Sequence, residues 1–367
     1  MKEHLVSVIL PTYKEAENIG IIIPKIFEVL KNAGLAGEVI VVDDDSPDGT
    51  AEVAAGLGRD YPVRVRVRKN ERGLATAVMK GFELAGGIVC VVMDADLSHP
   101  VEILPDMVRP IINNECDATV GSRYVSGGGS HDWSLCRRFI SKFSGLLARG
   151  LTELSDPTSG FMAIKRSALK GVALDPVGWK IVLEVIVKTG ARFKEVPIVF
   201  SDRKNGESKL GLRVQAEYIA HLWRLYQFKF SVPYQFLKFG TVGLSGLIVD
   251  TAVLMAFVEL AHFDPRIGAI IAFFSAVTSN YLLNRVWTFD AQGITRISTS
   301  FAWFVGVCLA GLCVRLGVMH LLIEFFKMGA GHRYVFASIL GILAATAFNF
   351  MGSKCLAFSV GLNRKQT

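Results

Sequence analysis

The sequence is poor in cysteine, which excludes a disulfide-stapled or zinc-organised domain. Only six cysteines occur among 367 residues, and they form no repeated pair of the kind that binds zinc. Each stands in an apolar context, so we expect reduced, buried thiols. They are Cys90, Cys116, Cys136, Cys308, Cys313 and Cys355.

The beginning of the chain lacks the pattern of a secretory signal. Glu15 and Glu17 interrupt it before a long apolar run can develop. We therefore expect the N-terminal half to stay in the cytoplasm.

Charge is scarce in the C-terminal half. Mostly apolar runs, each long enough to cross a bilayer as a helix, cover residues 236–260, 267–287, 301–326 and 335–360. Four spans return the chain to the side from which it entered, and Lys and Arg are more frequent on the side of the N-terminal half. We predict an α-helical, four-span transmembrane domain over 236–360, with a tail at 361–367 and both termini cytoplasmic. Four buried helices of a soluble core are disfavoured, because the apolar residues continue around every face.

Two ionisable residues lie well inside these spans, Asp250 in the first and Arg315 in the third. Unpaired charges are costly there. We predict that the two pair as a structural clamp within the bundle; part of a lipid pathway is the less favoured reading. Asn280, Asn284 and Asn349 are predicted to form hydrogen bonds between helices.

The N-terminal half alternates short β-branched runs with helical patterns. Residues 6–10, 38–43, 63–67 and 88–93 are predicted strands, with helices between them. This repetition predicts an α/β domain over 1–211 with a Rossmann-like, mostly parallel sheet covered by helices on both faces. Ligands of such sheets bind beyond the carboxyl ends of the strands.

The joint between the halves, residues 212–235, mixes Arg, Lys, Trp and Tyr with apolar residues. Such a segment can lie in the headgroup layer of a membrane. We predict an amphipathic interfacial linker; the alternative is an amphipathic helix packed on the domain.

Two carboxylates, Asp94 and Asp96, end the predicted strand 88–93. At a strand end both can turn toward one ion, and hard divalent cations such as Mg²⁺ and Mn²⁺ take carboxylate and phosphate oxygens. Surface acids or a helix cap are the alternative, but a second acidic strand end in the same sheet favours a metal. Ser98 could add a hydroxyl or hold a water, whereas His99 is interpreted as structural.

The turn after the first strand lies on the same predicted ligand side. Pro11 fixes the exit from the strand, Tyr13 offers a flat face, and Glu15 offers an acceptor for ribose hydroxyls or base N–H groups. Three adjacent acids follow the second strand, at residues 43–45. We expect one of them, Asp44, to face a nucleoside.

Cations gather in the rest of the N-terminal half. Arginine binds phosphate bidentately and stays charged, so these residues suit diphosphates and phosphate acceptors. The net charge of +7 likewise suits an anionic partner, and without a platform of interleaved aromatic and basic residues we expect no nucleic acid. The candidate cations are Arg123, Arg137, Arg203 and Lys209, while Arg138 and Lys204 are interpreted as surface charges.

Six motifs carry a resemblance to a known family: LPTYKEAENI, VVDDDSPDGT, MDADLSHP, GSRYV, DPTSGF and DRKNGESKLG. Together they resemble the polyprenyl-phosphate mannosyltransferases, which are inverting family 2 glycosyltransferases of the GT-A fold. The match runs through residues 5 to 225. KFGTVGLSGLIVD and SNYLLNRVWTF look like the GtrA-like four-helix membrane domain.

The resemblance implies an enzyme that transfers mannose from GDP-mannose to dolichyl or another polyprenyl phosphate, with Mg²⁺ or Mn²⁺ and a lipid bilayer. It implies that Asp94, Ala95 and Asp96 meet the ribose and the diphosphate-bound metal; some relatives carry Gln at position 98. The guanosine would be held by Pro11, Tyr13, Glu15, Val42 and Asp44. The phosphates of donor or acceptor would be held by Arg123, Arg137, Ser141 and Arg203, with help from Lys180 and Lys209.

The implied reaction needs no strong general base, because the acceptor phosphate is already an anion. That agrees with the lack of an obvious Ser/His/Asp or Cys/His constellation. In-line attack on C1 would invert an α-linked donor to a β-linked product, with metal and arginine stabilising GDP.

Two other readings stay open. One is a sibling enzyme that uses UDP-glucose or another nucleotide sugar, since pocket specificity cannot be read from sequence. The other is a membrane carrier of glycolipids whose soluble domain is not catalytic. Loss of transfer in an Asp96→Asn variant would separate an enzyme from a carrier.

Overall fold

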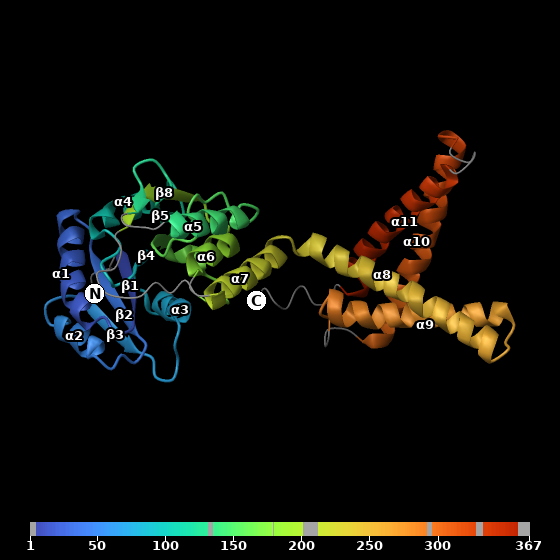
Figure 1. Ribbon diagram of the computed structural model, residues 1–367, viewed down its shortest axis with the longest axis horizontal. Helices are drawn as coiled ribbons and strands as arrows, with labels where there is room; N and C mark the ends of the chain where they lie inside the picture. The colour runs from blue at the N-terminus through green and yellow to red at the C-terminus, as the bar shows by residue number, and fades with distance from the viewer. Residues whose placement is uncertain are drawn as a thin grey trace. The chain divides into compact units, whose positions relative to one another are not determined.

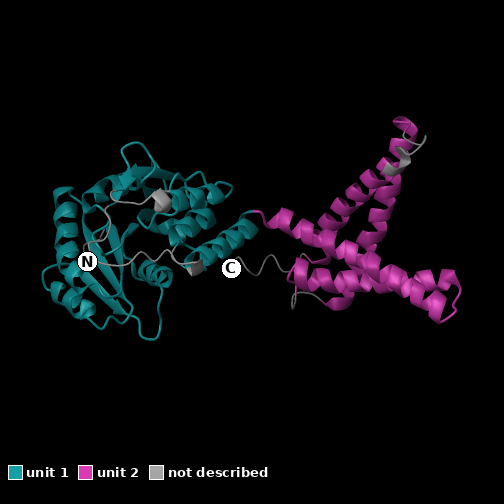
Figure 2. Cartoon of the chain, in the orientation of Figure 1, with its two compact units in different colours: residues 1–229 teal, residues 230–367 magenta. Residues whose placement is uncertain are grey.

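The chain divides into two compact units, residues 1–229 and residues 230–367 (Figures 1 and 2). The computed structural model describes residues 5–130, 135–178, 180–200, 212–291, 296–327 and 333–358. Within those ranges, only the backbone is described at 135–138, 212–213 and 333–335.

A mostly parallel seven-stranded sheet forms the centre of the first unit, in the order β3-β2-β1-β4-β7-β5-β8. Only β7 runs antiparallel to its neighbours, so the predicted Rossmann-like, mostly parallel architecture is confirmed. β6 (Gly129–Ser130) and β9 (Val199–Phe200) form a separate two-stranded pair. The sheet strands are β1 (Val6–Thr12), β2 (Gly37–Asp43), β3 (Val63–Val67), β4 (Val89–Val92), β5 (Ala118–Ser122), β7 (Met162–Lys165) and β8 (Phe193–Pro197).

Helices cover both faces of the sheet, because its central strands are apolar on both sides. Val8, Leu10 and Val91 pack toward one face with α1 (Ala16–Asn32), α2 (Thr50–Leu57) and α4 (Leu104–Ile112). Ile9, Val42 and Val92 pack toward the other face with α3 (Leu74–Leu84) and α6 (Ile181–Thr189). Short 3-10 turns at Val101–Ile103 and Arg166–Leu169 complete this core.

Two further helices, α5 (Leu135–Ala148) and α7 (Leu212–Lys229), pack together beside α6. Residues 212–229 thus form a helix of the first unit, and its interfacial role stays a prediction. Its inner face buries Tyr218, Leu222 and Leu225 against Leu151 and Leu183.

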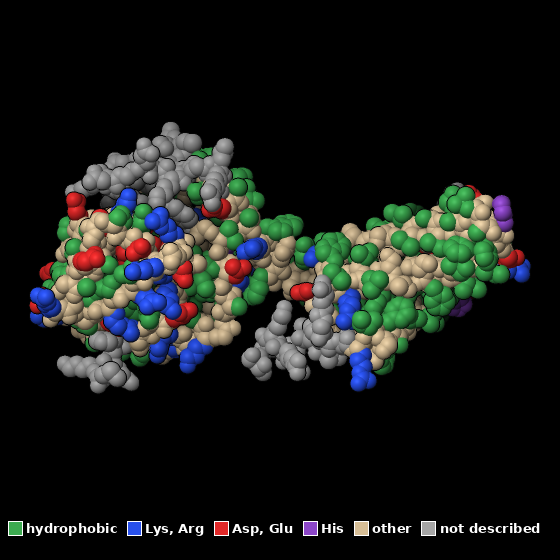
Figure 3. Space-filling model, turned by 90° about the horizontal axis from the view of Figure 1, so that it is seen from below, with side chains coloured by type: hydrophobic (Ala, Val, Ile, Leu, Met, Phe, Trp, Pro, Cys, Tyr) green, Lys and Arg blue, Asp and Glu red, His purple; other side chains and the backbone are tan. Residues whose placement is uncertain are grey.

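Among its described residues, the second unit contains four helices long and apolar enough to cross a membrane, as predicted. They begin with α8 (Ser231–Met255), α9 (Pro265–Leu283), α10 (Ile297–Phe325) and α11 (Arg333–Gly352). Wider π-helical turns follow three of them, at Ala256–Leu260, Asn284–Thr288 and Ser353–Ala357. Figure 3 shows hydrophobic side chains spread over the surface of this unit, as a lipid environment requires.

The two helical hairpins of the second unit repeat one packing scheme. Gly246 in α8 lies against the side chain of Asn280 in α9, and Gly311 in α10 lies against Asn349 in α11, so closely that a Cβ at either glycine would overlap the asparagine. Close approach at small residues is the usual basis of helix packing in membranes. Small or polar residues recur at every fourth position in both second helices: Gly268, Ala272, Ala276, Asn280, Asn284 and Thr288, and Ala337, Gly341, Ala345, Asn349, Ser353 and Ala357.

The predicted ion pair between Asp250 and Arg315 is wrong. Within the described part of the chain these two residues form no ion pair, and Arg315 Nη2 instead donates to Ser338 Oγ at 3.2 Å. Asp250 lies in α8, four residues after Gly246, and Arg315 lies in α10, four residues after Gly311. The two residues therefore belong to different hairpins. The hairpins diverge from a shared end (Figure 1).

Candidate active site

One edge of the sheet collects most of the predicted site residues. The carboxyl ends of β1, β2, β4 and β5 meet there because these strands are parallel. The antiparallel β7 brings its amino end to the same edge, and with it residues 156–161. The motif DPTSGF contains these residues, but the sequence pattern did not indicate their place in the site.

The acid pair follows β4 in a tight turn. Ser98 donates to Asp96 Oδ1 from its backbone N–H at 3.0 Å and from its hydroxyl at 2.5 Å, while Leu97 between them adopts a left-handed conformation with φ of 62°. His99 is buried, accepts a hydrogen bond at Nδ1 from the Asp94 backbone N–H, and stacks on Phe161. The turn therefore holds the Asp96 carboxylate through Ser98 and the Asp94 backbone through His99.

The surroundings of the acid pair fit a divalent cation. Carboxylate oxygens are the preferred donors for Mg²⁺ and Mn²⁺. Gly160 faces Asp94, and even a Cβ at this position would lie 3.5 Å from Asp94 Oδ2, so a larger side chain would fill the space in front of the carboxylate. In the part of the chain that is described, no three His, Cys, Asp or Glu side chains cluster as a complete metal site. A cation here would take its remaining ligands from phosphate or water.

Arg123 forms a buried ion pair at the end of β5. Its Nε and Nη2 donate to the two carboxylate oxygens of Asp156 at 2.6 and 2.7 Å, and Nη2 also donates to Thr158 Oγ1 at 2.9 Å. The side chains of Arg123 and Asp156 are 9% and 0% exposed. Although burial acts in the opposite direction, these bonds hold the pKa of Asp156 below its ordinary value. Ser141 Oγ lies 3.4 Å from Thr158 Oγ1, which joins α5 to this group.

Lys180 adds a second cation beside this ion pair. Its Nζ donates to the Thr158 carbonyl at 3.0 Å. Burial, together with the nearby Arg123 charge, lowers the pKa of Lys180 to about 8, against weaker opposing effects of Asp156 and Asp94. The lysine is thus mostly charged near neutral pH and close to its titration point.

The predicted nucleoside residues lie at the β1–β2 end of the same edge. Pro11 pairs with Val42 in the strand register, and both are buried. Tyr13 is 39% exposed, with the Arg72 guanidinium 4.8 Å from its ring centroid. Glu15 Oε2 accepts a hydrogen bond from Asn18 at 2.6 Å.

The acids after β2 already have partners within the protein. Asp43 accepts hydrogen bonds from Thr12 at 2.8 Å and from the Ser46 hydroxyl at 2.6 Å. Asp44 pairs with the buried Arg68 and accepts from the Gly73 backbone N–H at 2.8 Å. In this structure Asp44 holds residues 68–73 against β2, and its contact with a nucleoside stays a prediction. Arg68 was missed, because nothing in the sequence separates it from neighbouring surface cations.

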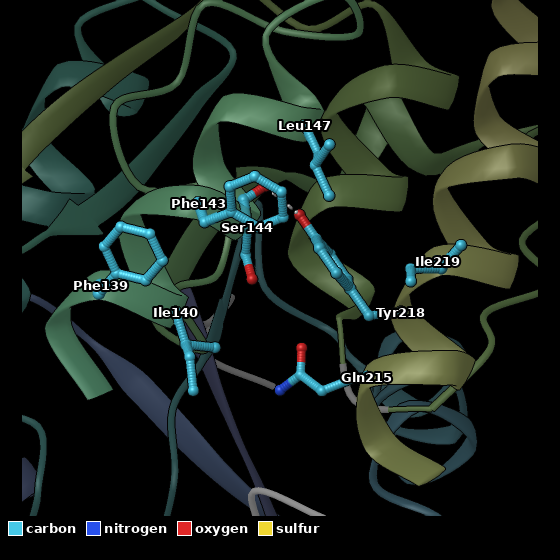
Figure 4. Close-up of a pocket in the computed structure, with 8 residues that line it drawn as sticks. All are labelled: Phe139, Ile140, Phe143, Ser144, Leu147, Gln215, Tyr218 and Ile219. Carbon is cyan, nitrogen blue, oxygen red and sulfur yellow. Dashed lines mark hydrogen bonds between the residues drawn. The ribbon is translucent and has the colours of Figure 1, made fainter. Parts of the chain in front are cut away.

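An apolar groove of about 170 Å³ lies between α5 and α7 (Figure 4). The Tyr218 hydroxyl donates to the Ser144 carbonyl at 2.8 Å at one side of it. Phe139 is 71% exposed, and its ring stacks near that of Phe143. The groove is lined by Phe139, Ile140, Phe143, Ser144, Leu147, Gln215, Tyr218 and Ile219.

Three predicted phosphate ligands cannot be placed. Arg203 and Lys209 lie outside the described residues, as does the side chain of Arg137. The structure brings together Asp94, Ala95, Asp96, Ser98, Arg123, Ser141 and Lys180 through β4, β5, α5 and the residues before β7.

Two domain models match the chain. Residues 7–172 match Glycosyl transferase family 2, and residues 238–359 match the GtrA/DPMS transmembrane domain. The chain is therefore a glycosyltransferase whose α/β domain is joined to a transmembrane domain. Among solved structures, glucosyl-3-phosphoglycerate synthase from Mycobacterium tuberculosis in complex with Mg²⁺ and UDP is 20% identical, with a TM-score of 0.49 and 60% of this chain and 79% of that chain covered.

Curated relatives define the family. The dolichol-phosphate mannosyltransferase of Pyrococcus furiosus is 37% identical over 351 residues, which cover 94% of this chain and 97% of the relative. The dolichol-phosphate mannosyltransferase of Saccharomyces cerevisiae is 39% identical over 236 residues, which cover 61% of this chain and 88% of the relative. The chain belongs to the dolichol-phosphate mannosyltransferase family, which confirms the resemblance read from its motifs.

Proposed function

We propose that this enzyme transfers mannose from GDP-mannose to a polyprenyl phosphate such as dolichyl phosphate, releasing GDP and forming a β-linked mannosyl phosphate lipid. The names of its relatives support the sugar and the acceptor. The observation that carries the proposal is that paired acids and two cations, Arg123 and Lys180, lie at one edge of the sheet, and that α5 joins this edge to an apolar groove.

The donor would bind across the β1, β2 and β4 ends. Pro11, Tyr13, Glu15, Val42 and Asp44 would hold the nucleoside. Asp94 and Asp96 would hold Mg²⁺ or Mn²⁺, with Ser98 orienting Asp96. The bound cation would neutralise charge on the diphosphate leaving group.

The acceptor would bind across the β5 and β7 side. Arg123, held by Asp156, and Lys180 present positive charge near Thr158 and Ser141. Arg137, Arg203 and Lys209 would add to it. Since α5 runs from this group to the apolar groove, a phosphate bound at Ser141 would leave its lipid chain close to Phe139 and Phe143.

The chemistry follows from this arrangement. An oxygen of the acceptor phosphate attacks C1 of mannose while the bond from C1 to the diphosphate oxygen breaks. Attack from the opposite face inverts the configuration. The attacking oxygen is anionic before it bonds C1, and the departing diphosphate oxygen takes up the negative charge when its bond breaks, so no proton needs to move and no general base is required. The residues act by holding two anions close together.

Such an acceptor also explains the second unit. A polyprenyl chain resides in a bilayer, and the four apolar helices are long enough to anchor the enzyme in one. We propose that the catalytic unit and both termini face the cytoplasm.

The test is direct synthesis. Purified full-length protein in lipid nanodiscs is incubated with a polyprenyl phosphate, Mg²⁺ or Mn²⁺, and either GDP-mannose or UDP-glucose, and the glycolipid is identified by mass spectrometry. We expect product from GDP-mannose, loss of turnover with excess chelator, and a loss of at least about a hundredfold in Asp96→Asn. Asp60→Asn, at an exposed carboxylate, is the matched control. Product from UDP-glucose alone would replace the donor, and activity unaffected by both chelation and Asp96→Asn would refute the site.

A further inference from the structure

A short segment at residues 172–178 leads into Lys180 and lies against one face of α7. Three residues of α7 meet it, Glu217, His221 and Arg224, spaced four and three apart and therefore on one side of the helix. The membrane unit begins directly after α7, since α8 starts at Ser231.

Each of the three residues has a distinct contact. His221 Nδ1 accepts the backbone N–H of Val177 at 3.2 Å. Arg224 forms an exposed ion pair with Asp175 at 3.0 Å. Gly178 has φ of 70°, and a Cβ there would lie 3.2 Å from Glu217 Oε2. Only the His221 contact is buried at the helix, with 1% of that side chain exposed.

The form of His221 follows from its surroundings. Because Nδ1 accepts a hydrogen bond, the proton of the neutral ring is on Nε2, which faces Glu184 Oε2 at 3.9 Å. Burial lowers the pKa of His221, with further lowering by Lys188 and Arg224, and this outweighs the opposing effect of Glu184. Glu184 also accepts the Asp175 backbone N–H at 2.6 Å, so α6 and α7 both hold the segment.

We propose that His221 is a positioning residue that, through Val177, holds Lys180 against the Thr158 carbonyl beside Arg123. The proposal rests on the function proposed above, in which Lys180 meets a phosphate. Lys180 follows Val177 by three residues and is the N-cap of α6, so displacement of the segment that His221 holds would move the lysine relative to Thr158. The helix that precedes the membrane unit thereby sets the position of an active-site cation.

Two substitutions at His221 distinguish the effect of losing the hydrogen-bond acceptor from the effect of losing the volume of the ring. Asparagine carries its amide oxygen on Cγ, as histidine carries Nδ1, so His221→Asn retains an acceptor for Val177. His221→Gln moves its amide toward the position of Nε2 and removes that acceptor. Tyr218→Phe is the matched control, because it also removes one hydrogen bond from α7, but to Ser144 of α5.

Two measurements on the full-length protein in nanodiscs test the proposal without requiring turnover. Hydrogen–deuterium exchange reports the protection of residues 172–178. Competitive lysine acylation with mass spectrometry reports the midpoint at which Lys180 titrates. In His221→Gln we expect exchange at least about tenfold faster and a midpoint moved from about 8 toward the ordinary 10.5, because the released lysine regains water. His221→Asn should recover both properties, and Tyr218→Phe should change neither.

Several results would overturn the inference. Unchanged Lys180 titration in His221→Gln would do so, whether or not exchange increased. Failure of His221→Asn to recover, or an equal effect of Tyr218→Phe, would assign His221 to general stability. Should His221→Gln not fold, His221→Asn decides, because a Lys180 midpoint or an exchange rate at residues 172–178 that differs from the wild type would overturn the inference. None of these outcomes bears on whether mannose is transferred, which the synthesis assay decides separately.

Discussion

Raising the pH should switch off the enzyme through Lys180. The cation is held by the Thr158 carbonyl at 3.0 Å, and burial brings its pKa to about 8. At pH 9 about one tenth of the lysine remains protonated, and each further pH unit removes another factor of about ten. If the charged form binds a substrate phosphate, kcat/KM should fall tenfold per pH unit above about 8.

The assay is the pH dependence of mannosyl transfer between about pH 6.5 and 10 in wild type and in Lys180→Arg. The acceptor adds little above about pH 7, because the second pKa of a phosphate monoester is near 6, and the guanine of the donor titrates identically with both enzymes. Arginine stays charged throughout, so Lys180→Arg should lack the decline that begins near pH 8 in the wild type. The decline in kcat should begin at higher pH than that in kcat/KM, because a bound phosphate retains the proton.

The contribution of Lys180 to folding stability should rise with pH, whereas its contribution to activity falls. Between about 8 and 10.5 the unfolded chain binds more protons at this lysine than the folded chain does. Its contribution to the free energy of unfolding therefore rises with pH across that window. Inactivation above pH 8 without a loss of thermal stability would support the assignment. An identical alkaline decline in Lys180→Arg would refute it.

Two further predictions concern packing. Asp156→Asn should lower the free energy of unfolding of the first unit by about 3–5 kcal/mol in denaturant, because it leaves the Arg123 guanidinium buried without its counter-charge. A loss below about 1 kcal/mol would contradict the buried pair. Gly311→Ala should lower the free energy of unfolding of the second unit by about 1–3 kcal/mol, and with it the melting temperature, because the new methyl overlaps Asn349. Gly306→Ala in the same helix is the control, with nothing within 4 Å of its Cβ, and equal melting temperatures for the two variants would exclude the glycine contact.

The periodicity of the sequence was sufficient to predict the architecture. Alternating β-branched runs and helical patterns predict strands and helices locally, and apolar runs long enough for a bilayer need no tertiary information. Asp94 and Asp96 were identifiable as a candidate metal site because they directly follow a buried strand. Antiparallel β7 was not among the predicted strands, and with it the placement of residues 156–161 was missed.

Pairing between distant side chains could not be predicted. The expected pair of Asp250 and Arg315 rested on similar depth in the membrane, but the helices form separate hairpins and Arg315 bonds Ser338. Asp44 was expected to face a nucleoside, and its bond to Arg68 depends on how residues 68–73 fold back on β2.

The amino-acid sequence by itself determined the two-part organisation, the ligand edge of the sheet and the family, because these depend on local patterns and on contiguous motifs. Only the tertiary structure decided that Asp156 holds Arg123, that Thr158 receives Lys180 and that His221 reaches the segment before that lysine. These contacts join residues 22 to 44 positions apart in the chain, and the geometry that makes a hydrogen bond exists only once the elements between them are packed.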